Sequence, residues 1–250
     1  MSQPRIHESL TRLFESKDRT LINSLLAHPD FESFACRIGA TKSKALISRA
    51  FIHSSFSHEF NIKDQEVLEF LGDAVLQLVI TEKLVTLYPN LPEGKLSKMR
   101  SFLVNEESLS KLAKFLEIEN YILLGKGEFA KKTFSQAAVL ADTFEALLAV
   151  LYRNEGFDFC REFILKLFLA TNADAFEIEN LESFDAKSKL QEFSLKNYKK
   201  LPVYKSTQKG EEFLVELFIN DEFINSGIFR SKKLGEKTLA QLYFKKLNSF

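Results

Sequence analysis

The sequence contains no tryptophan, only two cysteines, and no apolar run long enough to span a membrane. Cys36 and Cys160 have neither a CxxC partner nor a histidine-rich neighbourhood, which argues against a disulfide framework and against structural zinc. The first twenty residues mix acidic and basic side chains, so we expect no secretory signal. These absences predict a cytoplasmic protein with no membrane contact and no disulfide partner.

The chain also lacks a net charge, because 34 basic residues balance 34 acidic ones. The balance is uneven along the chain. From Phe184 to the end there are thirteen Lys and Arg against eight Asp and Glu, and the remainder has twenty-one against twenty-six. A basic carboxyl-terminal part would suit a phosphate backbone, although a surplus of this size is also common on surfaces that bind nothing.

Hydrophobic periodicity divides the 250 residues into two parts. Up to Leu169, apolar residues recur at helical intervals with little alternation, which predicts an all-helical part. The next segment, 172–184, has no helix-length pattern, and we interpret it as a tether. From residue 185 the pattern changes to helix, three strands and helix. The expected elements are a helix over Ser188–Tyr198, strands over Val203–Ser206, Glu212–Ile219 and Phe223–Phe229, and a last helix from Ser231.

Two acidic stretches stand out within the helical part. Glu66, Glu69 and Asp73 are three and four residues apart, and Asp142 and Glu145 are three apart, so each set projects from one helix face. Acids at this spacing are more often a solvated edge or partners of a Lys. However, their neighbours are mostly apolar and no Lys or Arg occurs from residue 66 to 80. A divalent cation such as Mg²⁺ would neutralise both sets, and Mn²⁺ suits the same oxygen ligands.

The runs around these acids resemble a known family. Leu68–Val75 reads LEFLGDAV and Leu140–Tyr152 reads LADTFEALLAVLY, and they resemble the signature and the second acidic helix of the ribonuclease III catalytic domain. Phe51–Phe56 is similar to the segment that precedes the signature. Further similar runs occur in the same order at Glu93–Ser97, Leu103–Glu107 and Leu124–Glu128. The resemblance implies an all-helical catalytic domain over residues 37–172.

The resemblance also implies a reaction and its residues. Four carboxylates would hold Mg²⁺ at the scissile phosphate: Glu69, Asp73, Asp142 and Glu145. Asp73 and Glu145 would be catalytic, and Glu66 and Glu93 would be outer acids that orient waters or substrate. The implied activity is endonucleolytic hydrolysis of double-stranded RNA by metal-activated water, leaving 5′-phosphate and 3′-hydroxyl ends, in RNA processing such as that of ribosomal RNA precursors.

A homodimer through the catalytic domain follows from the same resemblance. One carboxylate cluster cuts one strand, so cuts in both strands need two clusters related by a two-fold axis. Phe70, on the signature helix, is a candidate for the self-complementary surface of such a dimer. Simple packing of Phe70 in the core is the alternative.

Residues 185–250 resemble a double-stranded RNA-binding domain through Lys189–Phe193 (KLQEF), Leu201–Tyr204 (LPVY) and Ser231–Lys233 (SKK). The expected fold class is therefore mainly α: an all-helical catalytic domain followed by a small α+β domain in the order α-β-β-β-α. The resemblance places Gln191 and Glu192 at 2′-hydroxyls. It places Lys232 and Lys233 at phosphates.

This second part departs from its family in two places. Ser206–Gly210 lacks the Pro and His of the family's strand loop, and Gly235 stands where the family has Ala. A glycine inside a helix costs about 1 kcal/mol of propensity. We therefore expect weakened RNA binding by this domain alone.

The remaining segments complete the expected organisation. Residues 1–36 form an N-terminal extension whose apolar spacing predicts one or two amphipathic helices, with packing on the core as the default role. A linker is expected over 173–184, between the catalytic domain and the RNA-binding domain. Four histidines show no ligand spacing relative to the acids and are interpreted as structural, with His53 as an organising core residue: His7, His28, His53 and His58.

Two other functions remain open from the sequence. A catalytically silent relative that binds structured RNA would share this fold, but it would typically have lost one of the four carboxylates, and all four are present. A metal-dependent hydrolase of a small phosphorylated substrate would have no use for an RNA-binding-like domain. Both are less consistent with the sequence than a nuclease.

Overall fold

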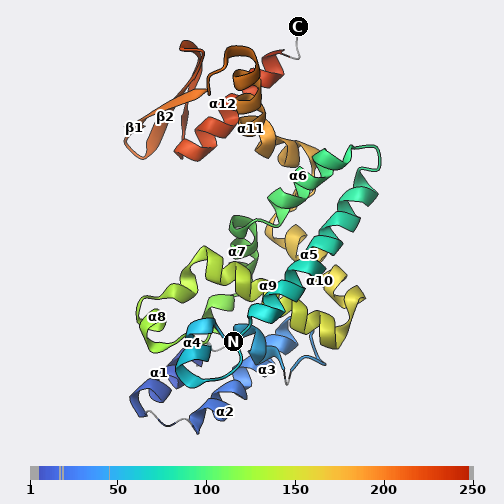
Figure 1. Cartoon of the computed structure of the whole chain (residues 1–250), viewed down its shortest axis with the longest axis vertical. Coiled ribbons are helices and arrows are strands. Elements are labelled where there is room, and N and C mark those ends of the chain that lie inside the picture. The colour runs from blue at the N-terminus through green and yellow to red at the C-terminus, as the bar shows by residue number, and fades with distance from the viewer. Residues whose placement is uncertain (1–5, 17, 19, 45, 248–250) are drawn as a thin grey trace. The chain divides into compact units, whose positions relative to one another are not determined.

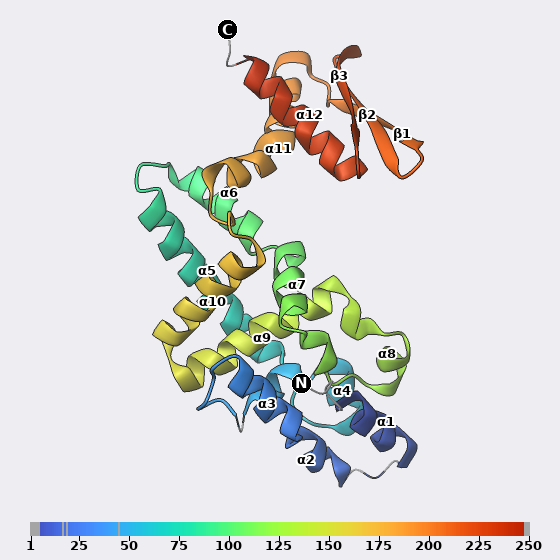
Figure 2. The same cartoon turned by 180° about the vertical axis from the view of Figure 1, so that it is seen from behind.

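The computed structural model describes residues 6–16, 18, 20–44 and 46–247, and Figures 1 and 2 show it from opposite sides. The chain forms two compact units that meet in sequence at Ala173 and Asp174. The first unit contains α1 (Ile6–Ser16), α2 (Leu21–Leu26), α3 (Pro29–Arg37), η1 (Ile47–Phe51), α4 (Ser54–Phe60), α5 (Glu66–Leu87), α6 (Glu93–Leu103), α7 (Glu106–Phe115), η2 (Ile118–Asn120), α8 (Lys126–Ala130), η3 (Thr133–Ser135), α9 (Ala137–Glu155) and α10 (Phe157–Thr171). The second contains α11 (Ile178–Tyr198), β1 (Val203–Lys209), β2 (Glu212–Ile219), β3 (Glu222–Phe229) and α12 (Lys232–Leu247). This order confirms the predicted fold class.

Helix α9 forms the centre of the first unit. From Val139 to Leu151 every residue is buried except two, Asp142 and Glu145, which are partly exposed. An apolar helix of this kind is stabilised by burial on nearly all sides. The two acids are therefore the exceptions in this stretch, and they lie where the hydrophobic core borders on solvent.

Helix α5 packs against α9, as both views show. The contact is closest at Gly72, where an added Cβ would lie 1.7 Å from the carbonyl oxygen of Glu145. No side chain larger than hydrogen fits in that space. The backbones of the two helices therefore meet between Asp73 and Glu145, and the acids predicted from the sequence come from both sides of this contact.

The N-terminal extension packs on the helical unit. Helix α1 buries an apolar face at Ile6, Leu10, Leu13 and Phe14. The ring of Phe14 lies 6.3 Å from that of Phe60 in α4 and 5.9 Å from that of Phe129 in α8. The extension contains three short helices, more than the one or two predicted, because Pro29 starts a further helix capped by His28.

The second unit is a three-stranded antiparallel sheet, in the order β1-β2-β3, with α11 and α12 packed on one face. Its core combines Leu190 of α11, Val215 and Leu217 of β2, and Leu239 of α12. A turn at Asn220 and Asp221 joins β2 to β3, and both residues have positive φ angles, 50° and 66°. Such a two-residue turn matches the twist of a hairpin.

Two boundaries differ from the prediction. Helix α11 begins at Ile178, within the expected linker, rather than at Ser188. Neither Gly nor Pro occurs between Ile178 and Tyr198, so the helix continues although its apolar pattern is weak. Strand β1 extends to Lys209, and a tight turn at Gly210, with a φ of 64°, replaces the longer loop of the resembled domain.

Gly235 has a packing role that the sequence did not reveal. It is buried, and an added Cβ would lie 2.5 Å from Val215 Cγ2 and 2.7 Å from Phe229 Cδ2. The glycine lets α12 approach the sheet closely. Its cost in helix propensity is thus offset by close packing, and alanine would not improve this helix.

Two sequence-based absences can be checked in the structure. None of the helices in the described part of the chain has the length and apolar character needed to cross a bilayer. Cys36 is exposed and Cys160 is buried, and both are free thiols in the described part of the chain.

The contact at Gly72 gives a direct test of the fold. We expect Gly72→Ala to lower the free energy of unfolding by about 3 kcal/mol, because the new methyl group overlaps backbone atoms that have no room to move. Gly94→Ala in α6 is the matched control: its added Cβ meets no atom within 4 Å, and stability should be unchanged or slightly higher. Chemical denaturation measures both. Equal stability of the two variants would contradict the close contact.

Candidate active site

Four carboxylates lie on either side of the contact between α5 and α9. Glu69 and Asp73 are on the first turns of α5, and Asp142 and Glu145 are on α9. All four side chains are partly buried. Near the start of α5, buried Gln65 donates from Nε2 to Thr143 Oγ1 at 3.3 Å, which fixes the helices at a second point. The structure thus brings together the four acids that the sequence singled out.

The electrostatics show that these carboxylates influence one another. Burial, followed by the charges of Asp73, Glu69 and Asp142, raises the pKa of Glu145 to about 8. Burial also raises the pKa of Glu69, with smaller contributions from Asp142, Glu66 and Asp73. These shifts mean that the fully ionised cluster is unfavourable in the protein alone.

Basic side chains do not relieve this repulsion. None of the four carboxylates forms an ion pair with a Lys or Arg among the described residues. The carboxylate of Asp73 accepts from Gln77 Nε2 at 2.9 Å through both oxygens, which holds it without adding positive charge. Oxygen donors that lack a cationic partner are the ligand set of a hard divalent cation.

The site has the donor chemistry for a metal but not a closed cage. Within the described part of the chain, no three His, Cys, Asp or Glu side chains together meet the geometry of a metal site. Mg²⁺ usually keeps several waters and takes only one or two carboxylates directly, with substrate phosphates completing its shell. The four residues therefore fit a cation that is held partly through water and substrate.

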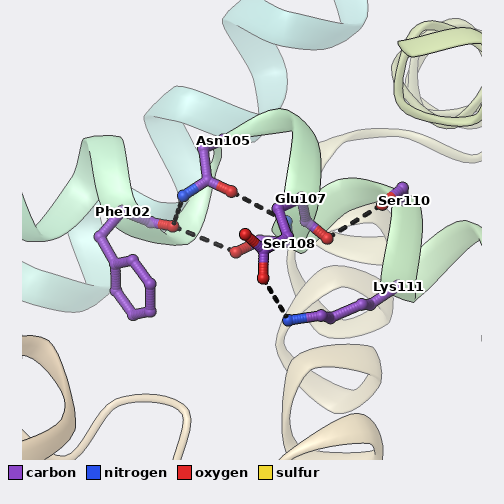
Figure 3. A network of polar contacts seen from close by, with 6 residues as sticks. All are labelled: Phe102, Asn105, Glu107, Ser108, Ser110 and Lys111. Atoms are coloured by element: carbon purple, nitrogen blue, oxygen red, sulfur yellow. Dashed lines mark hydrogen bonds and ion pairs between the residues drawn. The ribbon is translucent and has the colours of Figure 1, made fainter. Parts of the chain in front are cut away.

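Helix α7 supplies a further acid that the sequence left without a role. Asn105 caps this helix: its Oδ1 accepts from the Ser108 N–H at 2.9 Å, and its Nδ2 donates to the Phe102 carbonyl at 2.8 Å (Figure 3). The cap fixes Glu106 as the first residue of α7. Burial is the main cause that raises the pKa of Asp142, and the charge of Glu106 adds to this effect.

The same network stabilises the start of α7. Ser108 Oγ donates to the Phe102 carbonyl at 3.1 Å, and Lys111 pairs with Glu107 at 3.0 Å one turn along the helix (Figure 3). Glu107, unlike Glu106, is thus neutralised locally. By capping α7, Asn105 also sets the position of Glu106, whose charge acts on Asp142.

The two outer acids differ in position. Glu66 is exposed at the first residue of α5 and contributes to the raised pKa of Glu69, so it lies at the edge of the cluster. Glu93 begins α6 and lines a cavity of about 370 Å³ with Thr81 and Arg100. Thr81 is about 12 Å beyond Asp73 along α5. Glu93 is not among the charges that raise the pKa of Glu69, Asp142 or Glu145.

His53 is brought towards the acids, although sequence spacing gave no link between them. Burial lowers its pKa, and the charges of Glu128, Asp142, Glu66 and Asp64 oppose that effect. These acids lie on different elements, so only the folded chain collects them around the imidazole.

In the second unit, the predicted RNA contacts lie on its two helices. Gln191 is partly exposed and Glu192 is exposed, both on α11. Lys232 begins α12, and its Nζ lies 5.5 Å from the centre of the Phe213 ring. Lys233 also belongs to α12, but its side chain lies outside the described residues. Amides and lysines at such positions suit the hydroxyls and phosphates of an RNA duplex.

A helical unit with four clustered carboxylates, joined to an α-β-β-β-α unit, is the arrangement expected of a nuclease that acts on duplex RNA. Comparison with known proteins supports this class. Residues 43–171 match the family described as Ribonuclease-III-like, and residues 186–247 match the double-stranded RNA binding motif.

Individual relatives agree with the family match. The chain is 39% identical to Ribonuclease 3 of Borreliella burgdorferi over 82% of this chain and 85% of that protein. It is also 39% identical to Ribonuclease 3 of Enterococcus faecalis, over 81% and 90% of the two chains. The nuclease domain of ribonuclease III from Campylobacter jejuni superposes with a TM-score of 0.53 at 33% identity, over 56% of this chain and 96% of that one. The chain belongs to the ribonuclease III family, and it is a double-stranded RNA endoribonuclease.

The raised pKa of Glu145 predicts how stability depends on pH. Between about pH 4.5 and pH 8 the folded, metal-free protein keeps a proton on Glu145 that the unfolded chain has lost, so wild-type stability falls as pH rises through this range. Glu145→Gln removes the ionisable group. In chelator, we expect the variant to melt at nearly the wild-type temperature at pH 4.5 and several degrees higher above pH 8.

Glu162→Gln is the control for this experiment. Glu162 is exposed and paired with Lys166, which lowers its pKa, so its replacement gives no gain at high pH. Thermal melts from pH 4.5 to 9 measure both variants. A Glu145→Gln difference that stays constant across this range would contradict the burial of an uncompensated carboxylate.

Proposed function

We propose that Glu69, Asp73, Asp142 and Glu145 bind Mg²⁺ and that the chain uses it to hydrolyse the phosphodiester bonds of double-stranded RNA. Members of this family are metal-dependent nucleases. The observation that carries the proposal is the set of four partly buried carboxylates, from two helices in backbone contact, with no Lys or Arg partner among the described residues. Mn²⁺ suits the same donors.

Each protein group has a role in this reaction. Asp73, held by Gln77, and Glu145, at the helix contact, are the proposed catalytic residues. Bound Mg²⁺ supplies a water of lowered pKa as nucleophile and neutralises charge at the scissile phosphate. No side-chain nucleophile is required: water would attack phosphorus, the bond from phosphorus to the 3′ oxygen would break, and the departing 3′ oxygen would take up a proton, which leaves 5′-phosphate and 3′-hydroxyl ends. Glu66 at the edge of the cluster orients waters or substrate.

The second unit supplies further contacts to the RNA duplex. We propose that Gln191 and Glu192 contact 2′-hydroxyls and that Lys232 and Lys233 contact phosphates. The short turn at Gly210 leaves less chain to enter a minor groove, and affinity then depends more on the catalytic unit. Structured precursors such as those of ribosomal RNA are the proposed substrates.

A cleavage assay tests the metal and its ligands. Purified protein is incubated with a labelled RNA duplex of a few helical turns, with Mg²⁺ or with chelator. We expect Mg²⁺-dependent cuts in both strands, and a loss of at least about 100-fold in rate for Asp73→Asn and for Glu145→Gln. Glu162→Gln, on the exposed face of α10, should cut at the wild-type rate. Full activity of either carboxylate variant, or activity in chelator, would overturn the proposed site.

A homodimer explains how both strands are cut. Helix α5 exposes an apolar stripe comprising Val67, Phe70, Leu78 and Val85. Their separations of three, eight and seven residues are close to whole helical turns, so they share one face. Phe70 is 82% exposed, which rules out the alternative that it packs in the core of its own chain. A stripe of this kind, next to the carboxylates, is a self-complementary surface that places two sites about one two-fold axis. The similar nuclease domain from Campylobacter jejuni has structural flexibility in a region involved in dimer formation.

Phe70 provides the test of this interface. Phe70→Glu should convert the dimer to a monomer in analytical ultracentrifugation, because a charge would be buried at the centre of the interface. Phe115→Glu is the matched control, since Phe115 is also a phenylalanine and 55% exposed, but on α7. A dimeric Phe70→Glu protein, or a monomeric Phe115→Glu protein, would place the interface elsewhere.

A further inference from the structure

Gln77 contacts one of the four carboxylates directly. It lies one turn beyond Asp73 on α5, and its side-chain Nε2 donates to Oδ1 and to Oδ2 of Asp73, at 2.9 Å in each case. A carboxylate offers only acceptors, and the nitrogen is the only donor of the amide, so these contacts also fix which way the amide faces.

The turn that carries Gln77 is fixed by further contacts. The Thr81 hydroxyl donates to the Gln77 carbonyl at 2.6 Å and accepts from Nη1 of Arg100, in α6, at 3.0 Å. Leu76, next to Gln77, is fully buried. The amide therefore extends towards Asp73 from a backbone that is tied to a second helix and anchored in the core.

The equal distances have a consequence for how Asp73 can bind a cation. They place Nε2 midway between the two carboxylate oxygens, which is where a cation lies when one carboxylate chelates it through both oxygens. An ionised carboxylate has about four lone-pair directions, so an oxygen of Asp73 can still bind a cation from its other side. Gln77 thus leaves Asp73 as a ligand through one oxygen.

Divalent cations differ in their need for the position that Gln77 fills. Ca²⁺ takes roughly six to eight oxygens in flexible geometry and readily accepts chelating carboxylates. Mg²⁺ requires a nearly regular octahedron, which the narrow angle of a chelating carboxylate would distort. A residue that blocks chelation therefore costs Ca²⁺ more than Mg²⁺.

We propose that Gln77 is a positioning residue that holds Asp73 for ligation through one oxygen and thereby favours Mg²⁺ over Ca²⁺ at the nuclease site. This inference rests on the proposed metal site, and it adds a residue that does not itself bind the metal. Partners of this kind that orient ligating carboxylates commonly affect metal binding by about 10-fold or more.

Support of the helix is the alternative role, because a Gln and an Asp four residues apart also stabilise a helix through their hydrogen bond. The two roles predict different results. Loss of helix support would weaken the binding of every cation by a similar factor. Loss of the positioning contact would change the ratio of Ca²⁺ to Mg²⁺ affinity, because only a chelated cation gains from the freed position.

The experiment measures Mn²⁺ binding to the full-length protein without RNA, by electron paramagnetic resonance, with Mg²⁺ and Ca²⁺ as competitors. Gln77→Met keeps the length of the side chain but removes the donor. We expect it to shift the ratio of affinities about 10-fold towards Ca²⁺ and to make cleavage in Mg²⁺ correspondingly more sensitive to added Ca²⁺. Gln241→Met, the same exchange on α12, is the control and should leave the ratio unchanged.

Gln77→Lys returns a donor to the same position. Its added charge should weaken the binding of both cations, but the ratio should stay near the wild-type value. An unchanged ratio in Gln77→Met would overturn the proposal, and so would equal shifts in the Met and Lys variants, because the shift would then not depend on the donor.

Asp73→Asn distinguishes a failure of this role from a failure of the metal site. If the wild-type protein binds no Mn²⁺ that Asp73→Asn weakens, the proposed metal site fails and the role of Gln77 fails with it. If that site is present and Gln77→Met loses affinity for Mg²⁺ and Ca²⁺ by the same factor, only the role of Gln77 is overturned.

Discussion

The backbone contact between Gly72 of α5 and Glu145 of α9 is the constraint on which the rest of the site depends. Two helices can approach this closely only where one of them has no side chain, and here that position is next to Asp73. The contact brings two pairs of acids together in a partly buried space. A larger residue at position 72 would separate the helices and disperse the charges, so the glycine is as much a part of the site as the acids themselves.

The cluster is held together against its own electrostatics. Burial and mutual repulsion raise the pKa of Glu145 to about 8, so the apolar packing of α9 stabilises an arrangement that the charges oppose. A divalent cation bound there would reverse this balance, since it would turn repulsion between neighbouring carboxylates into shared ligation. Binding to the folded state alone then links metal affinity to stability. A neutral donor, Gln77, holds Asp73 without adding positive charge.

The sequence predicted the helical unit, the α-β-β-β-α unit and the four carboxylates, because helical spacing and strand composition are local properties. Contacts between distant segments were not predictable in this way. The charge of Glu106, at the start of the helix that Asn105 caps, acts on Asp142 of another helix. The charges of acids from several elements act on His53 only after folding. Its low helix propensity made Gly235 look unfavourable in the sequence, yet the missing side chain lets α12 pack closely on Val215. The early start of α11 was missed because a helix needs no apolar periodicity where nothing breaks it.

The most direct test of the account is the position of a bound cation. Crystals of the RNA-free protein soaked in Mn²⁺ would show the ion by anomalous scattering. We expect a peak beside Glu69, Asp73, Asp142 and Glu145, at about 2.0 to 2.3 Å from the oxygens that bind the ion directly, with waters completing the shell. A peak at another group of residues, or none at these four at a Mn²⁺ concentration that supports RNA cleavage, would contradict it.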